Sequence, residues 1–96
     1  MQGQYKVPGG KLVIADFQLQ DNRLHSVRIH GDFFLEPDSA LEIINLSLEG
    51  LPADSNLSAI CSAINANLPD KTVMYGFDST AIAIAIMRGL TPLPQS

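Results

Sequence analysis

The segments with strand character all precede the segments with helix character in this chain, and this order constrains the fold more than any other feature. Residues 11–35 are rich in β-branched and aromatic residues, whereas helical patterns follow Pro37. Strands joined by short turns pair antiparallel, because a parallel pair needs a long crossover connection. The sequence therefore predicts an α+β fold, with a short antiparallel sheet of about three strands and about three helices packed on one face.

Three strands are expected, over residues 11–19, 23–30 and 33–35, and Asp21-Asn22 forms the turn between the first two. Residues 1–10 contain Pro and Gly near their end and are expected to form a loop that leads into the first strand. These segments predict an antiparallel meander.

Side-chain alternation within the second strand predicts which residues share a face. His25, Val27 and Ile29 fall on one face, whereas Leu24 and His30 fall on the other. The chain has two histidines, and on opposite faces they cannot bind one metal ion together. We expect ordinary surface or rim positions for both.

The clearest helix begins at Ser39, because Ser39 and Glu42 have the spacing of a capping box. Gly50 stands where a left-handed residue ends many helices, and Pro52 follows it. Apolar residues recur at helical spacing between these ends. They are Leu41, Ile43, Ile44 and Leu48.

A second helix is predicted over residues 55–67, with a cap at Asp54 or Ser55 and a stop at Pro69. Cys61, the single cysteine, lies on the apolar stripe of this helix. A free cysteine in such a position behaves as a small buried hydrophobe. A reactive thiol needs an electropositive and partly exposed site, so we expect Cys61 to belong to the core.

Residues 78–89 are ambiguous, because their isoleucines alternate as in a strand while their alanines favour a helix. Asp78 or Ser79 can cap a helix here. We predict a helix, followed by an extended tail around Pro92 and Pro94.

The composition is that of one globular domain. The chain has 96 residues, of which 46% are hydrophobic and 17% charged. The net charge is −4 without any basic cluster, so neither nucleic acid nor membrane is an expected partner. One cysteine excludes an internal disulfide. No signal peptide and no apolar run of roughly 20 residues is present, so we expect a cytoplasmic protein.

The usual catalytic and metal-binding motifs are missing. The sequence has no Gly-x-Ser-x-Gly elbow, Cys-x-x-Cys pair, His-Glu-x-x-His helix or Rossmann glycine pattern. Asp32, Glu36 and Asp38 supply three carboxylates that could hold magnesium. Acidic residues are also favoured in turns and at a helix N-terminus, and we take this second interpretation. No catalytic residue and no metal site is predicted.

The segment from Lys6 to Lys11 contains the adjacent glycines Gly9 and Gly10. A P-loop needs four residues between its glycines and a following helix, whereas a strand is expected here. The segment is therefore no nucleotide site in its own right. It does place two lysines on either side of a turn that glycine permits.

The first predicted strand is apolar on both faces, since Leu12 and Ile14 lie opposite the main apolar face. A sheet covered by helices on one side is usually polar on the other. Either a partner surface or the C-terminal tail would cover the second face. The main face carries Val13, Ala15, Phe17 and Leu19.

Several segments resemble the C-terminal accessory domain of lipoate–protein ligases, which in some organisms is a separate small subunit. The more specific segments are Lys6–Val13, with its Lys-x-x-Gly-Gly-Lys pattern, and Val27–Pro37, with its Gly-Asp-Phe-Phe pattern. The helix that ends in Leu48-Glu49-Gly50 and the Tyr75-Gly76-Phe77 link add to the likeness. It covers residues 5–90 of a single domain over 1–96.

The resemblance implies a fold similar to that of iron–sulfur scaffold proteins and a role beside a separate catalytic subunit. That subunit binds ATP, Mg and lipoate, makes lipoyl-adenylate, and transfers the lipoyl group to acceptor proteins. This chain alone would bind no cofactor and would meet the acceptors indirectly. The residues expected near the partner or nucleotide are Lys6, Gly9, Gly10, Lys11, Asp32, Phe33 and Phe34.

Two other functions fit the sequence. The implied likeness to cluster scaffolds suggests iron–sulfur or sulfur-transfer chemistry, although such proteins use three cysteines or one on an exposed loop, unlike Cys61. A non-catalytic protein-binding domain is the other alternative.

For the accessory role, Phe33 and Phe34 would point to opposite faces of a strand, so that one enters the core and the other meets a partner.

Overall fold

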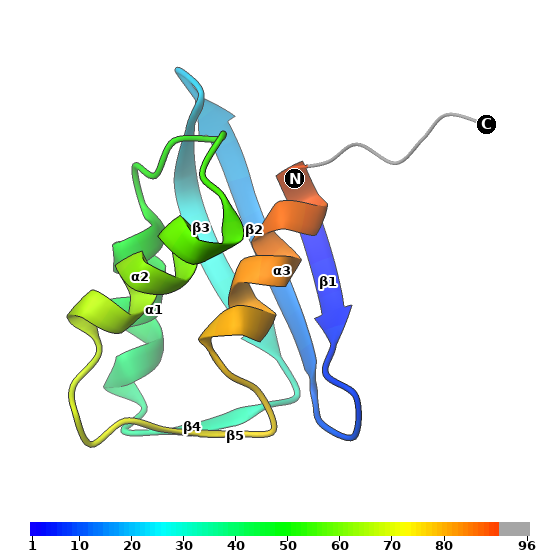
Figure 1. Cartoon of the computed structure of the whole chain (residues 1–96), viewed down its shortest axis with the longest axis vertical. Helices are drawn as coiled ribbons and strands as arrows, with labels where there is room; N and C mark the ends of the chain where they lie inside the picture. The colour runs from blue at the N-terminus through cyan, green and yellow to red at the C-terminus, as the bar shows by residue number, and fades with distance from the viewer. Residues whose placement is uncertain (91–96) are drawn as a thin grey trace.

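The computed structural model describes residues 1–90, and Figure 1 shows their arrangement. A three-stranded antiparallel sheet forms the back layer, helices cover one of its faces, and a separate pair of short strands crosses one end. The predicted α+β class is confirmed. The elements are β1 (Gln2–Lys6), β2 (Leu12–Gln20), β3 (Arg23–Gly31), β4 (Phe34–Glu36), α1 (Ser39–Leu48), α2 (Leu57–Asn67), β5 (Val73–Tyr75) and α3 (Ser79–Leu90).

The larger sheet differs from the predicted meander in its first strand. Its order is β1-β2-β3, and β1 pairs antiparallel with β2 from Gln2↔Asp16 to Lys6↔Leu12. The prediction of a loop over residues 1–10 was therefore wrong for its first half. This strand has little apolar signal, because Gly3 occupies a buried position where a strand usually carries a large side chain.

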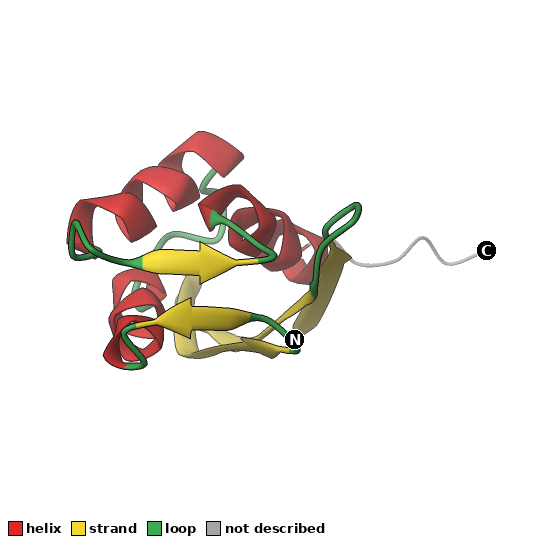
Figure 2. Ribbon diagram, turned by 90° about the horizontal axis from the view of Figure 1, so that it is seen from below, coloured by secondary structure: helices red, strands yellow, loops and turns green. Residues whose placement is uncertain are grey.

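The strand expected over residues 33–35 exists, but it belongs to a different sheet. β4 pairs with β5 through Phe34↔Tyr75, Leu35↔Met74 and Glu36↔Val73, and not with β3. The pairing joins segments separated by more than thirty residues of chain, so no local pattern could have indicated it. Figure 2 shows the two short strands from the end at which they lie.

An irregularity in β3 changes the predicted faces. Ser26 has a positive φ of 55°, and the register with β2 shifts between Asp16 and Gln18. A bulge of this kind adds one residue to a strand and reverses the alternation beyond it. Leu24 is therefore buried on the same side as Val27 and Ile29, which corrects its predicted position.

The core lies between the sheet and the helices. Val13, Ala15 and Phe17 of β2 are buried there, as predicted for the main face of this strand. On the opposite face no element of residues 1–90 covers the sheet, and Leu12 and Ile14 are half-buried between their neighbours. The tail expected around Pro92 and Pro94 lies outside the described residues.

α1 packs against β3 and buries Ala40, Ile44 and Leu48. The capping box is absent, because Asp38 holds the cap position with no side-chain hydrogen bond and Ser39 is already helical. Gly50 has a φ of 80°, in the left-handed region predicted for it.

α2 packs between α1 and α3. Its cap is Asn56, whose side-chain oxygen accepts a hydrogen bond of 2.8 Å from the backbone N–H of Ala59. The prediction of Asp54 or Ser55 as the cap was wrong by one or two positions. The hydroxyl of Ser55 instead donates to the carbonyl oxygen of Pro52 within the preceding turn.

α3 is the helix chosen for the ambiguous segment, and Asp78 caps it by accepting a hydrogen bond from the N–H of Ala81. It is buried on most sides because it packs against β1, β2 and α2. The alternating isoleucines therefore reflect a helix that contacts two layers. None of the helices within residues 1–90 has the length and apolar character to span a membrane.

Candidate functional site

Three segments that carry the sequence resemblance converge at one end of the molecule, which we call the basal end: residues 6–12, 31–36 and 73–77 (Figures 1 and 2). The N–H of Lys11 donates a 2.9 Å hydrogen bond to the carbonyl oxygen of Gly76. The N–H of Leu12 donates a 2.8 Å hydrogen bond to Oδ1 of Asp32. The fold thus ties the hairpin loop, the end of β3 and the end of β5 into one surface.

Glycines make this close approach possible. A Cβ on Gly10 would lie 2.5 Å from the carbonyl oxygen of Gly76, and a Cβ on Gly76 would lie 2.5 Å from Cγ of Lys11. Gly9 has open space around it but a φ of +71°, which favours glycine at the turn. Gly9 therefore shapes the turn, whereas Gly10 and Gly76 allow two loops to touch.

Lys6 and Lys11 are both exposed at the basal end. Lys6 pairs with Leu12 and shares the open face of the sheet, whereas Lys11 leans toward Gly76 on the other side of the hairpin. Neither lysine forms an ion pair within residues 1–90, where the recorded pair is that of His30 with Asp16. Both ammonium groups can therefore meet an anion brought by a partner.

Phe33 and Phe34 point to opposite sides, as predicted. The Phe33 ring stacks on Phe77 at a centroid distance of 4.1 Å. Phe34 is 65% exposed and contacts Tyr75 edge-on at 6.5 Å between centroids. The first ring fixes the basal end to the core, and the second stands on the surface.

The three clustered carboxylates have separate surroundings. Asp32 accepts the hydrogen bond from Leu12, Glu36 lies on the exposed face of β4, and Asp38 precedes α1. Among residues 1–90, no group of three or more His, Cys, Asp or Glu is arranged to hold a metal ion. The position of Asp32 indicates a structural role at the junction of β2 and β3.

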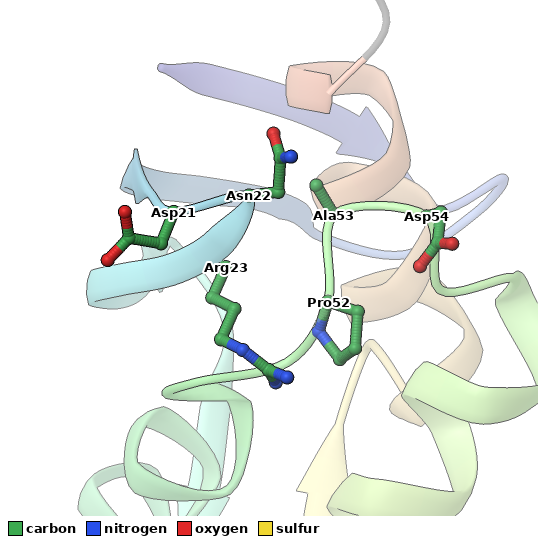
Figure 3. A pocket seen from close by; sticks show the side chains of 6 residues that line it. All are labelled: Asp21, Asn22, Arg23, Pro52, Ala53 and Asp54. Atoms are coloured by element: carbon green, nitrogen blue, oxygen red, sulfur yellow. The ribbon is translucent and has the colours of Figure 1, made fainter.

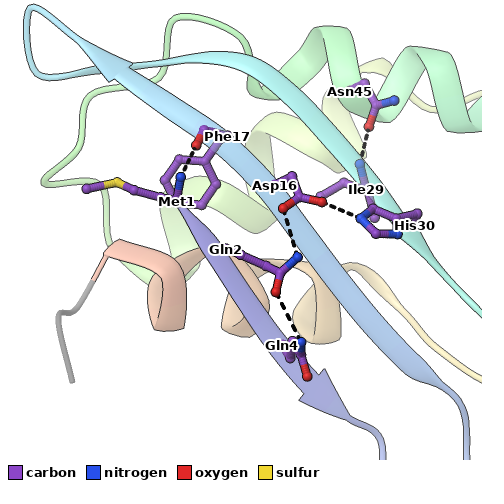
Figure 4. A network of polar contacts seen from close by, with 8 residues as sticks. All are labelled: Met1, Gln2, Gln4, Asp16, Phe17, Ile29, His30 and Asn45. Carbon is purple, nitrogen blue, oxygen red and sulfur yellow. Dashed lines mark hydrogen bonds and ion pairs between the residues drawn. The ribbon is translucent and has the colours of Figure 1, made fainter.

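The open face of the sheet carries a polar network, drawn in Figure 4. His30 binds the Asp16 carboxylate, which also accepts a 3.0 Å hydrogen bond from the amide of Gln2. The hydrogen bond with His30 is the main reason that the pKa of Asp16 is lowered, against a smaller opposing effect of burial. This network joins β1, β2 and β3 across the open face.

The prediction that the two histidines lie on opposite faces was wrong. His25 pairs with Gln18 and His30 pairs with Ile14, and both partners face away from the helices. The bulge at Ser26 places both histidines on the open face. A single residue in the left-handed region thus reversed the expected arrangement.

Cys61 lies on α2 and is only half-buried, because it packs against the edge of the core, so the prediction that it belongs to the core is confirmed only in part. Its Sγ is 3.9 Å from the Thr80 hydroxyl oxygen, at the contact between α2 and α3.

A cleft of about 450 Å³ lies at the other end of the molecule, where the β2–β3 turn meets the segment between α1 and α2 (Figure 3). A backbone hydrogen bond joins the two loops that line the cleft, since the N–H of Ala53 donates to the carbonyl oxygen of Asn22 at 2.7 Å. The Arg23 guanidinium donates to the carbonyl of Gly50 at 2.9 Å. Sequence reasoning missed this cleft, whose two loops are joined by the Arg23 side chain and by backbone groups.

Comparison with solved structures shows what kind of domain this is. The fold matches a chain in the structural analysis of an archaeal lipoylation system, a bi-partite lipoate protein ligase and its E2 lipoyl domain from Thermoplasma acidophilum. The TM-score is 0.70 at 20% sequence identity, and the match covers 90% of this chain and 92% of that chain. The two chains are therefore of similar length and share one α+β fold over about nine tenths of each.

No protein-family model and no curated protein matches the sequence. The structural match therefore defines the class: a small α+β domain with the fold of a chain from a lipoate protein ligase system. Likeness to iron–sulfur scaffold proteins stays a prediction.

Proposed function

We propose that this chain is an accessory subunit of a lipoate–protein ligase, and that it assists ATP-dependent activation of lipoate to lipoyl-adenylate by a separate catalytic subunit. The observation that carries the proposal is the fold, shared over 90% of this chain with a chain from the bi-partite ligase structure. The convergence of three of the four resembling segments at the basal end supports it, because residues that serve one interface must share one surface.

The interior of the chain favours an assisting role over independent catalysis. Every buried side chain recorded among residues 1–90 is apolar. Acid–base and nucleophilic groups gain catalytic strength when they are held in a water-excluded site, and residues 1–90 bury no such group. ATP, Mg and lipoate would bind to the catalytic subunit, and acceptor proteins would meet this chain only through that complex.

The basal end suits a position beside the nucleotide. Adenylation requires exclusion of water and stabilisation of negative charge on the phosphates. A subunit seated over the nucleotide excludes water, and the free ammonium groups of Lys6 and Lys11 supply positive charge. Gly9 and Gly10 shape the turn that carries the lysines, and Asp32 anchors that turn to the end of β3 through Leu12.

The test is reconstitution with a ligase catalytic chain that lacks an accessory domain of its own. Pyrophosphate release with ATP, Mg and lipoate should be slow for the catalytic chain alone and should rise about tenfold or more when this chain is added. Replacing both lysines, by Lys6→Ala and Lys11→Ala, should reduce the stimulated rate by about tenfold, which corresponds to about 1.4 kcal/mol of barrier.

Arg28→Ala is the matched control, because it also removes an exposed positive charge but lies in the middle of β3. Its stimulated rate should equal that of the wild type. Absence of any stimulation by the wild-type chain would reject the proposed function. Full stimulation by the double lysine variant would remove Lys6 and Lys11 from the mechanism while leaving the accessory role intact.

A further inference from the structure

The outward face of the β4–β5 pair exposes three large apolar side chains side by side. Phe34 is 65% exposed, Tyr75 48% and Val73 45%. The register sets Phe34 opposite Tyr75 and Glu36 opposite Val73, so all four residues share this face. The opposite face carries Leu35 and Met74, which pack against the core. We call Phe34, Val73 and Tyr75 the aromatic patch.

The other exposed large apolar residues recorded in residues 1–90 are scattered. They lie at the N-terminus, at the end of β2 and on two different helices: Met1, Leu19, Leu46 and Leu57. Isolated exposed hydrophobic residues are normal on a folded protein, whereas adjacent ones mark an interaction surface. Exposed aromatic side chains are the type that contributes most binding energy at protein interfaces.

The aromatic patch rests on a rigid base. Phe33, the residue before β4, stacks on the buried Phe77, and Leu35 of β4 is 7% exposed. Phe34 and Tyr75 also contact each other edge-on, so each ring limits the freedom of the other. A surface that is already ordered loses less conformational entropy when it binds.

The charge around the patch indicates what it binds. The two segments that contain it, residues 32–38 and 70–78, carry five carboxylates and one lysine, Lys71, and the adjoining turn brings Lys11 against Gly76. Two copies of this chain, each with a net charge of −4, would bring these acidic segments together. Like charges facing each other across an interface are unfavourable, whereas complementary charge selects the partner. The patch therefore suits an apolar surface with basic residues around it.

We infer that the aromatic patch is the surface that docks on the catalytic subunit, and that it meets an apolar site rimmed by arginine or lysine. This inference rests on the proposed function. It also connects the patch to the lysines, because the backbone N–H of Lys11 donates a hydrogen bond to the carbonyl oxygen of Gly76, the residue that follows Tyr75. Docking through the patch would hold the lysine-bearing turn against the same partner. A catalytic subunit that binds the phosphates of ATP needs basic residues near that site.

The test measures the affinity of the same catalytic chain for three forms of this protein by calorimetry. Phe34→Ser combined with Tyr75→Ser should weaken binding by about thirtyfold, the loss expected for two interface aromatics. Leu46→Ser is the matched control, because Leu46 is also 65% exposed but lies on α1. It should bind within about twofold of the wild type, and circular dichroism should show all three forms folded.

A charge variant keeps the inference testable if the double variant fails to fold. Glu36→Arg reverses the charge beside the patch without removing an aromatic ring, and it should weaken binding by about threefold or more at low salt, with the difference shrinking as salt is added.

The outcomes separate the inference from the proposed function. If the wild-type chain stimulates the catalytic chain but the patch variants bind as tightly as the wild type, the inference is wrong and the proposed function stands. If the wild-type chain neither binds nor stimulates, both are wrong. A dimer of the wild-type chain that the double variant abolishes would show that a second copy occupies the patch, and would also overturn the inference.

Discussion

Gly3 shows how much one missing side chain contributes to this fold. A Cβ at this position would lie 1.8 Å from the carbonyl oxygen of Ala85 and 2.4 Å from the backbone nitrogen of Gly89. Gly89 of α3 also has no room for a side chain, since a Cβ at this position would lie 2.7 Å from Cε1 of Phe17. β1 and α3 therefore touch backbone to backbone, and this contact attaches the edge strand to the domain.

Gly3→Ala should destabilise the protein, because the backbone atoms around the new Cβ cannot move aside without separating β1 from α3. We expect a loss of about 2–3 kcal/mol in the free energy of unfolding, the range for an overpacked core. Urea denaturation measures it. Gln4→Ala, on the open face of the same strand, should change the free energy by less than about 0.5 kcal/mol. Equal effects of both substitutions would contradict the backbone contact.

At the scale of elements, α1 protects the edge of the sheet that β3 forms. The N–H of Ile29 donates a 2.9 Å hydrogen bond to the side-chain oxygen of Asn45, and the N–H of Val27 donates a 3.2 Å hydrogen bond to Glu49. An edge strand with unpaired N–H groups is a template for association with another chain. Asn45 of α1 and Glu49, which directly follows α1, thus occupy donors that another strand could otherwise use.

Asn45→Ala should leave the N–H of Ile29 without its partner in a partly buried place. A donor left unsatisfied in this way costs about 1–3 kcal/mol, and urea denaturation should show a loss in that range. Leu46→Ala on the neighbouring position is exposed and should be nearly neutral. If Asn45→Ala proves as mild as Leu46→Ala, the side chain does not contribute to the stability of β3.

The elements also show where prediction from sequence succeeds. The helices were predictable because apolar periodicity and stop signals such as Gly50 and Pro69 are local. The first residue of α2 was harder to predict, because Asp54, Ser55 and Asn56 can each cap a helix and only the loop geometry selects Asn56. Strand alternation failed in β3, since nothing in the residue type of Ser26 announces a φ of 55°.

The basal end was predictable only in part, because local patterns in the sequence do not indicate contacts between distant segments. Alternation within one strand was enough to place Phe33 and Phe34 on opposite sides, whereas the inward position of Phe33 and the outward position of Phe34 came only from the structure. The participation of Val73 and Tyr75 depends on the pairing of β4 with β5, which no local pattern carries. The lysine-bearing turn was identified, but its attachment to Gly76 depends on the same long-range contact.

At the scale of the whole molecule, the two ends have different characters. The basal end gathers the aromatic patch, the two lysines and the glycine contacts. The opposite end holds the polar cleft between the β2–β3 turn and the α1–α2 segment, lined in part by Asp21, Asn22 and Asp54. Under the proposed function, this protein works by seating its basal end against another polypeptide.

Hydrogen exchange of the whole chain, with and without the catalytic subunit, tests that claim most directly. Added subunit should slow amide exchange in residues 6–12, 31–36 and 73–77, because docking shields the basal end from water and opposes its local opening. Exchange around the polar cleft, in residues 20–24 and 51–55, should not change. Protection confined to the cleft, or no protection anywhere in the presence of excess catalytic subunit, would contradict the account.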